Sequence, residues 1–223
     1  MNVDLVQWGI IGEWAPQLAL AALVTLQISA MSFVVALVVG VLSGVATSKK
    51  RWWAMPIVWY VEFFRGTPLL VQLFFIYYGL AQVGLVFPAD VAAVVGLGLN
   101  SGAYIAEIVR GALMGIDQGQ YDAANALGFR WWQVLLWVVA PQALRIATPP
   151  LVNSFSALLK ESSLVSLLAI TEIMNVANQI YSRTFRAFEI FGVVALMYFV
   201  MTFAVSRLSK VLERRLSRHV QTT

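Results

Sequence analysis

The chain has 223 residues, of which 60% are hydrophobic and only 12% are charged, and its formal net charge is +4. Soluble domains carry about 25% charged residues, so this composition excludes an ordinary soluble fold and indicates an integral membrane protein. There is no cysteine, and the one histidine, His219, lies in the charged tail. Disulfides and thiolate sites are therefore excluded, and a histidine metal site is not expected.

The N-terminal stretch has no basic n-region and contains Asp4 and Glu13, so a cleaved signal peptide is not expected. The uncharged run 14–48 exceeds the ~20 residues that cross a bilayer, and three basic residues follow it. The aromatic-rich stretch 52–65 predicts an interfacial segment, because Trp and Tyr favour the headgroup level. We expect five spans, at 14–48, 68–87, 90–113, 149–173 and 190–207.

Two Thr-Pro pairs predict helix starts. Thr is a good N-cap and Pro is favoured at the first helical position, so helices are expected to begin at Pro68 and Pro149. The stretch 131–144 is uncharged but short, and Pro141 interrupts it. It predicts an interfacial or partly buried helix, and 175–189 predicts an external stretch.

Positive charge predicts the orientation of the spans. With the N-terminus outside and the C-terminus cytoplasmic, residues 49–51, the loop 114–146 and the basic tail at 210–219 all lie inside. Arg183 and Arg186 are mild exceptions. Five spans do not divide into two equal inverted halves, so a passage between two chains about a two-fold axis is favoured.

Polar residues are expected near the middle of the membrane. At ~1.5 Å per residue, Lys160 and Glu161 lie roughly 17 Å beyond Pro149, and Asn100 and Ser101 reach a similar depth from the other side. Ionisable groups there are costly unless they face a wet cavity or a partner. In one interpretation Glu161 lines a substrate passage and accepts a ligand ammonium group. Hydrogen bonds would come from Asn100, Ser101, Tyr104, Ser162 and Ser163.

The alternative interpretation stays open, in which Lys160 and Glu161 pair with other helices or with a second subunit and touch no ligand. Two further pairs lie three residues apart, Glu107 with Arg110 and Glu62 with Arg65. This spacing predicts local ion pairs at the inner interface.

Several stretches resemble one family. They are FRGTPLLVQLFFIYYGL at 64–80, LNSGAYIAEIVRGAL at 99–113, GQYDAANALG at 119–128, APQALR at 140–145 and KESSLVS at 160–166. In this order they resemble the permease subunit of a bacterial ATP-binding-cassette (ABC) importer of the polar amino acid type, whose substrates include histidine, glutamine, glutamate, arginine, cystine and opines.

The family's cytoplasmic signature is Glu-Ala-Ala, a Gly and a later Pro. Asp122, Ala123, Ala124, Gly128 and Pro141 match it here. Asp122 replaces the usual Glu, and Ala140 replaces the Leu before the Pro.

The resemblance implies a single permease domain, 1–223, of the type I importer fold in the bacterial inner membrane, with a coupling loop at about 114–146. The docking element would be the helix at 120–128, with contacts from Gln120, Tyr121, Asp122, Ala123, Ala124 and Gly128. The stretch 130–144 would join it to the span that carries Glu161.

The implied partners are a second permease chain, the same or related, two ATPase subunits and an extracytoplasmic amino acid binding protein. No G-x-x-x-x-G-K-[ST] motif occurs, so no nucleotide site or enzymatic activity is expected, and ATP and Mg would belong to the partner ATPase. The alternatives are a self-sufficient channel or secondary transporter for small polar solutes, and a membrane scaffold without transport.

Overall fold

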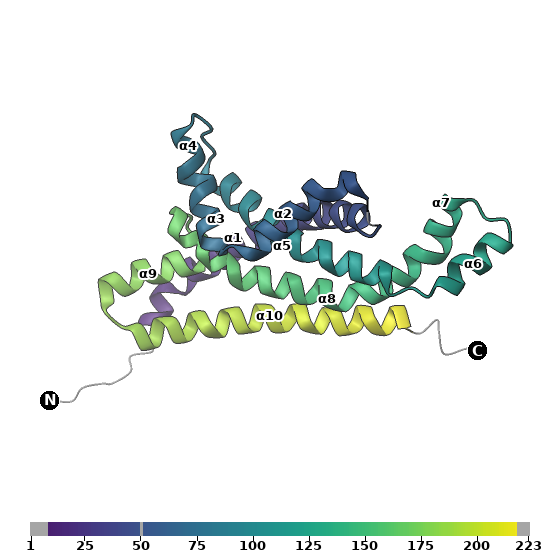
Figure 1. Cartoon of the computed structure of the whole chain (residues 1–223). Helices are drawn as coiled ribbons and strands as arrows, with labels where there is room; N and C mark the ends of the chain where they lie inside the picture. The colour runs from purple at the N-terminus through teal and green to yellow at the C-terminus, as the bar shows by residue number, and fades with distance from the viewer. Residues whose placement is uncertain (1–8, 50, 218–223) are drawn as a thin grey trace.

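The computed structural model describes residues 9–49 and 51–217, and every regular element within these ranges is a helix (Figure 1). The expected all-α fold is therefore confirmed. Residues 1–8, Lys50 and the end of the basic tail, including Arg218 and His219, lie outside the described residues.

The described helices divide by length. The four longest are α1 (Gly9–Thr47), α5 (Ala89–Met114), α8 (Ala140–Glu161) and α10 (Ala187–Ser217). The shorter ones are α2 (Met55–Gly66), α3 (Leu69–Phe74), α4 (Leu80–Gln82), α6 (Gln118–Ala126), α7 (Trp131–Gln133) and α9 (Ile173–Thr184). Connecting helical segments are of the 3-10 type at Trp52–Ala54 and Ser162–Leu168, and of the π type at Phe75–Gly79 and Val134–Val139.

Small residues bring α1 and α5 into close contact. A Cβ added at Gly40 would lie 2.5 Å from the Cγ2 of Ile105, and one at Gly44 would lie 2.6 Å from the Ala106 carbonyl oxygen. Two glycines four residues apart lie on one helix face, which lets two backbones approach closely. This contact fixes the centre of the helix bundle.

Within residues 9–49 and 51–217, four helical stretches, instead of the expected five, are long and apolar enough to cross a membrane. They are Gly12–Thr47, Ala89–Met114, Trp131–Leu168 and Ala187–Arg207. The expected span at 68–87 contains a shorter apolar helix, Leu69–Gln82, which ends before Phe87.

The chain nevertheless returns between α1 and α5. The ends of both helices line the same pocket together with α6, so both finish at the same end of the molecule. The return path is α2, the break at Thr67-Pro68 and the helix Leu69–Gln82.

The Thr67-Pro68 pair does not start a helix in the expected way. Pro68 is the N-cap residue and α3 begins at Leu69. The Thr67 hydroxyl donates to the Phe63 carbonyl oxygen at 2.8 Å and accepts from the Gln72 amide at 2.7 Å. Thr67 therefore closes the end of α2, because tertiary contacts outweigh its N-cap preference.

The Thr148-Pro149 pair lies inside α8, so the predicted helix start there is wrong. The prolines at 149 and 150 are both interior residues, and the Thr148 hydroxyl donates to the Leu144 carbonyl oxygen at 2.6 Å. Pro141 falls in the first turn of α8, directly after the π-helical segment Val134–Val139. The stretch 131–144 is therefore the first part of one continuous helical stretch that ends at Leu168.

Residues 175–189 were expected to be an external stretch, but α9 fills most of this range. Its buried face, Ile173, Val176, Ala177 and Ile180, packs against Leu18 and Ala21 of α1 and against α10. Figure 1 shows α9 at the end of the molecule opposite α6 and α7.

Candidate functional site

Helix α6 has well-defined ends. Asp117 is its N-cap, and the Asp117 carboxylate accepts from the Gly119 N–H at 2.8 Å. At the other end the Gly128 N–H donates to the Asn125 carbonyl oxygen at 2.9 Å, and the Phe129 N–H donates to that of Ala124 at 3.2 Å. This is the Schellman arrangement, with Gly128 at φ +78°. The predicted helix and its glycine turn both lie where the sequence placed them.

One face of α6 packs against the rest of the chain. Ala124 is 4% exposed and lies in a cluster with Ile116, Val134 and Val139. Tyr121 and Phe129 pack on the edge of the same cluster. These contacts hold α6 against the π-helical segment at Val134–Val139.

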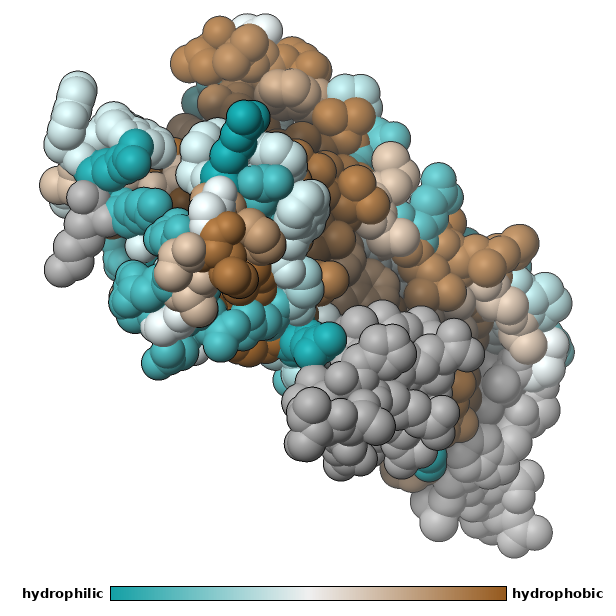
Figure 2. All heavy atoms as spheres, turned by 90° about the vertical axis from the view of Figure 1, so that its right-hand side faces the viewer, coloured by the Kyte–Doolittle hydropathy of each residue, from teal (hydrophilic) through white to brown (hydrophobic). Residues whose placement is uncertain are grey.

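The opposite face of α6 is exposed. It carries Gln120, Asp122, Ala123, Ala126 and Leu127, and the Leu127 side chain is 75% exposed. Leu127 was not among the predicted contact residues, although it lies four residues after Ala123 on the same face. Figure 2 looks at this end of the molecule: hydrophilic residues gather on the left of the view around a small hydrophobic patch, and hydrophobic residues dominate its upper and right-hand parts. An exposed helix face of small and apolar residues with one acid can fit into a complementary groove on another protein.

The six predicted coupling residues therefore divide between the two faces. Asp122 and Ala123 are exposed, whereas Tyr121 and Ala124 face the chain itself. The side-chain amide oxygen (Oε1) of Gln120 accepts from the side-chain amide of Gln142 at 3.2 Å, which ties α6 to α8. Gly128 has no side chain, and its contribution is the left-handed backbone conformation of the turn.

Glu161 ends α8 and is half-buried, while its neighbour Lys160 is exposed. Neither forms an ion pair within residues 9–49 and 51–217. The hydroxyls of Ser162 and Ser163 donate to the carbonyl oxygens of Leu159 and Lys160, each at 2.8 Å. In the described chain the Glu161 carboxylate thus accepts no hydrogen bond, and the interpretation of it as a ligand site stays a prediction.

Asn100 is buried in α5 and already has partners. Its side-chain amide donates to the side-chain oxygen (Oε1) of Gln72 at 2.9 Å and to the backbone carbonyl oxygen of Phe64 at 3.2 Å. Ser101 is also buried, whereas Tyr104 is 46% exposed. Asn100 therefore joins α5 to the break between α2 and α3, and Tyr104 is the more accessible of the predicted α5 residues.

The two predicted local ion pairs have different outcomes. The pair in α5 is confirmed, since the Arg110 guanidinium donates to the Glu107 carboxylate at 2.9 and 2.6 Å. The pair of Glu62 with Arg65 is wrong, because Arg65 instead lies 3.8 Å from Glu107 and 5.7 Å from the Tyr104 ring centre. Arg65 therefore links α2 to α5.

A buried carboxylate at Glu172 was not predicted. Its oxygens accept from the Asn175 N–H at 2.8 Å, from the Tyr198 hydroxyl at 3.1 Å and from the Thr25 hydroxyl at 3.5 Å. Burial raises the pKa of Glu172, although these donors oppose the shift. Glu172 caps α9 and joins it to α1 and α10. The signal in the sequence was a lone acid in a long uncharged stretch.

Comparisons with known proteins agree with this architecture. The family described as "Binding-protein-dependent transport system inner membrane component" matches residues 36–218. The glutamine transport system permease protein GlnP of Escherichia coli K12 is 38% identical over 212 residues, covering 94% of this chain and 97% of GlnP. The L-cystine transport system permease protein TcyB of Bacillus subtilis is 33% identical over 201 residues, covering 88% of this chain and 85% of TcyB.

Two solved structures share the fold. A crystal structure of an amino acid ABC transporter with histidines matches with a TM-score of 0.87 and 35% identity, covering 94% of this chain and 99% of that one. The MetNI methionine ABC transporter, in an inward-facing conformation, matches with a TM-score of 0.73 at 20% identity, covering 95% and 100%. The chain therefore belongs to the inner membrane components of binding-protein-dependent transport systems, and within them to the amino acid ABC transporter permeases.

Proposed function

We propose that this chain is the permease subunit of an ATP-driven amino acid importer, in which two permease chains form the passage. The observation that carries the proposal is the exposed face of α6, joined through a single turn to the continuous helical stretch Trp131–Leu168 that contains Glu161. Such an arrangement connects a docking surface to a membrane-embedded acid through one covalent path.

The exposed α6 face is the proposed contact with an ATPase subunit. Ala123 and Ala126 present no bulk, so a groove can receive the helix closely, and Leu127 can be buried there. Among the described residues Asp122 accepts a hydrogen bond from Gln118 alone, at 3.2 Å, and retains lone pairs for a donor on the partner. ATP and Mg belong to the ATPase, because this sequence has no P-loop motif.

The proposed passage uses the more accessible of the predicted residues. The Glu161 carboxylate would accept the ammonium group of an amino acid, and Ser163 and Tyr104 would offer hydroxyls from η4 (Ser162–Leu168) and α5. Asn100, Ser101 and Ser162 are buried and would position these elements in the state described. An extracytoplasmic binding protein would deliver the amino acid.

The test is reconstitution in proteoliposomes with the cognate ATPase and binding protein. We expect uptake of a radiolabelled amino acid only with ATP inside, and ATP hydrolysis that rises when loaded binding protein is added. The permease chain alone should neither hydrolyse ATP nor transport. ATP-independent uptake by the chain alone would refute the proposal and would favour a channel or secondary transporter.

A further inference from the structure

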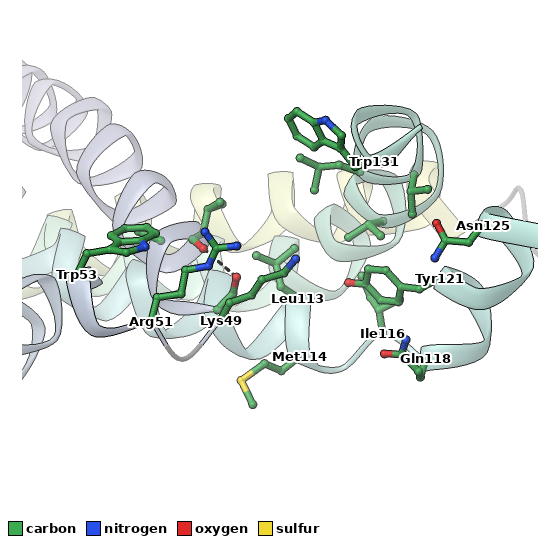
Figure 3. Close-up of a pocket in the computed structure, with 16 residues that line it drawn as sticks. Lys49, Arg51, Trp53, Leu113, Met114, Ile116, Gln118, Tyr121, Asn125 and Trp131 are labelled. Atoms are coloured by element: carbon green, nitrogen blue, oxygen red, sulfur yellow. Dashed lines mark hydrogen bonds between the residues drawn. The ribbon is translucent and has the colours of Figure 1, made fainter. Parts of the chain in front are cut away.

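A pocket of about 700 Å³ opens beside α6, away from its exposed docking face. Lys49, Arg51 and Trp53 line one side, and Gln118, Tyr121 and Asn125 of α6 line the other (Figure 3). The floor comes from the last turns of α1 and α5 and from the start of the Trp131–Leu168 stretch. The pocket therefore lies between the membrane helices and α6.

The charge in this pocket is positive. Its lining contains no Asp or Glu. Lys49 and Arg51 form no ion pair with any residue that the structure describes, and the Arg51 guanidinium lies 5.9 Å from the Trp53 ring centre. Two cations without a protein counter-charge favour an anionic occupant.

The pocket is also apolar over much of its surface. Val45, Leu113, Leu135 and Val139 contribute to its lining. A free phosphate would gain nothing from these side chains, whereas a molecule with an anionic head and a hydrocarbon part would bury its apolar surface against them. The pocket chemistry therefore fits an amphiphile.

The position of the pocket points to the membrane surface. The apolar span of α1 ends at Thr47, two residues before Lys49. Trp52 is 87% exposed and Trp131 is 78% exposed, and exposed Trp residues at span ends mark the headgroup level. Basic pockets between membrane helices are typical sites for the headgroups of anionic lipids.

We propose that this pocket binds an anionic phospholipid, with the lipid phosphate beside Lys49 and Arg51 and the start of an acyl chain along the apolar wall. Since α6 forms the opposite wall, a bound lipid would hold α6 against the ends of α1 and α5. The lipid composition of the membrane would then bias the position of the docking helix. The site itself does not depend on the transport activity proposed above.

The test is native mass spectrometry of the purified full-length chain with phosphatidylglycerol or phosphatidylcholine. We expect retention of phosphatidylglycerol and not of phosphatidylcholine. Lys49→Gln and Arg51→Gln should each weaken retention of phosphatidylglycerol about fivefold, which is the typical effect of one cation at a lipid surface. Arg51→Lys keeps the positive charge and should retain the lipid as the native chain does. Arg145→Gln removes an exposed cation outside the pocket lining and is the matched control.

Several results would overturn the proposal. Equal retention of the two lipids would show that charge does not select the occupant. An equal loss in Arg145→Gln would show only a general effect of net charge. Displacement of the lipid by glycerol 3-phosphate would assign the site to a free anion, and displacement by the cognate ATPase would assign the pocket to that protein interface.

Discussion

Gly128 offers a change whose effect can be separated from side-chain clashes. Its φ of +78° lies in the left-handed region, and an added Cβ would meet no atom within 4 Å. Gly128→Ala therefore introduces backbone strain and nothing else. That strain costs about 1–2 kcal/mol for a residue with a Cβ, which shifts the balance between the closed and an open turn by roughly 5–30-fold.

The closed turn holds Phe129 against the α6 cluster. The Phe129 N–H donates to the Ala124 carbonyl oxygen, and the Phe129 ring lies 5.8 Å from the Trp137 ring. If the turn opens, α6 loses its fixed direction relative to the helical stretch that follows it. We expect ATP-dependent uptake in Gly128→Ala to fall about fivefold or more, with the protein still present in the membrane.

Two variants make this prediction specific. Gly128→Asn should retain most of the uptake, because Asn tolerates the left-handed region better than other residues with a side chain. Gly84→Ala is the matched strain control, since Gly84 has φ +89° and also has no atom within 4 Å of an added Cβ. It lies in the loop between α4 and α5, far from α6 (Figure 1). Normal coupling in Gly128→Ala, or an equal loss in Gly84→Ala, would refute the reasoning.

Three further predictions concern the acids and the α1–α5 contact. Glu161→Gln should lower amino acid uptake about tenfold in proteoliposomes, whereas Lys160→Gln should not, and unchanged uptake in the first variant would assign Glu161 a structural role. Glu172→Ala should destabilise the folded chain by about 2–4 kcal/mol, because the Asn175 N–H and the Tyr198 hydroxyl lose their acceptor, whereas the Thr25 hydroxyl keeps the Ala21 carbonyl oxygen at 3.0 Å. Burial raises the pKa of the Glu172 carboxyl in the folded chain. Its contribution to the free energy of unfolding is therefore present at low pH and declines as the pH rises through the folded-state pKa. Because Gln does not titrate, the melting temperature of Glu172→Gln should depend less on pH than that of the native chain. Gly44→Leu should lower the stability of the folded chain by about 1–3 kcal/mol through overpacking, which thermal melting in detergent would measure. Gly192→Leu is the control and should be tolerated, because an added Cβ at Gly192 meets nothing within 4 Å.

Composition and short motifs predicted much of the fold correctly. The span at 90–113 matches α5, and the helix with its glycine turn at 120–128 matches α6. Both depend on local signals: a long apolar run, or a helix former followed by a glycine at a left-handed position. Signals of this kind act within a few residues, and the tertiary contacts of these two helices do not override them.

The helix start predicted at Thr148-Pro149 failed for a different physical reason. In water, a backbone that leaves the helix at Pro149 can hydrogen-bond to solvent, so proline marks a start. Within an apolar span there is no such alternative, and the helix continues past Pro149 and Pro150. The Thr148 hydroxyl bonds back to the preceding turn, which is one of the ways in which such helices compensate.

The hydrogen-bond and ion-pair partners of several polar residues could not be predicted from neighbouring residues in the sequence. The Asn100 amide bonds to Gln72 and Phe64, which are 28 and 36 residues away in the sequence. Arg65 pairs with an acid on α5 instead of the acid three residues before it. Sequence spacing predicts contacts along one helix, but the choice between a local and a distant partner is made when helices pack together.

The stiffness of the path from α6 to Glu161 varies along its length, and this bears on how a motion would be transmitted. The path begins with the π-helical segment Val134–Val139, where the hydrogen-bond ladder is wider. It then passes Pro149 and Pro150, neither of which can donate to the preceding turn. Between these places the chain is α-helical, with Pro141 in the first turn of α8. We infer that a displacement of α6 would be carried rigidly from the π-helical segment to the prolines and would there become a bend, which changes the direction of the last turns before Glu161.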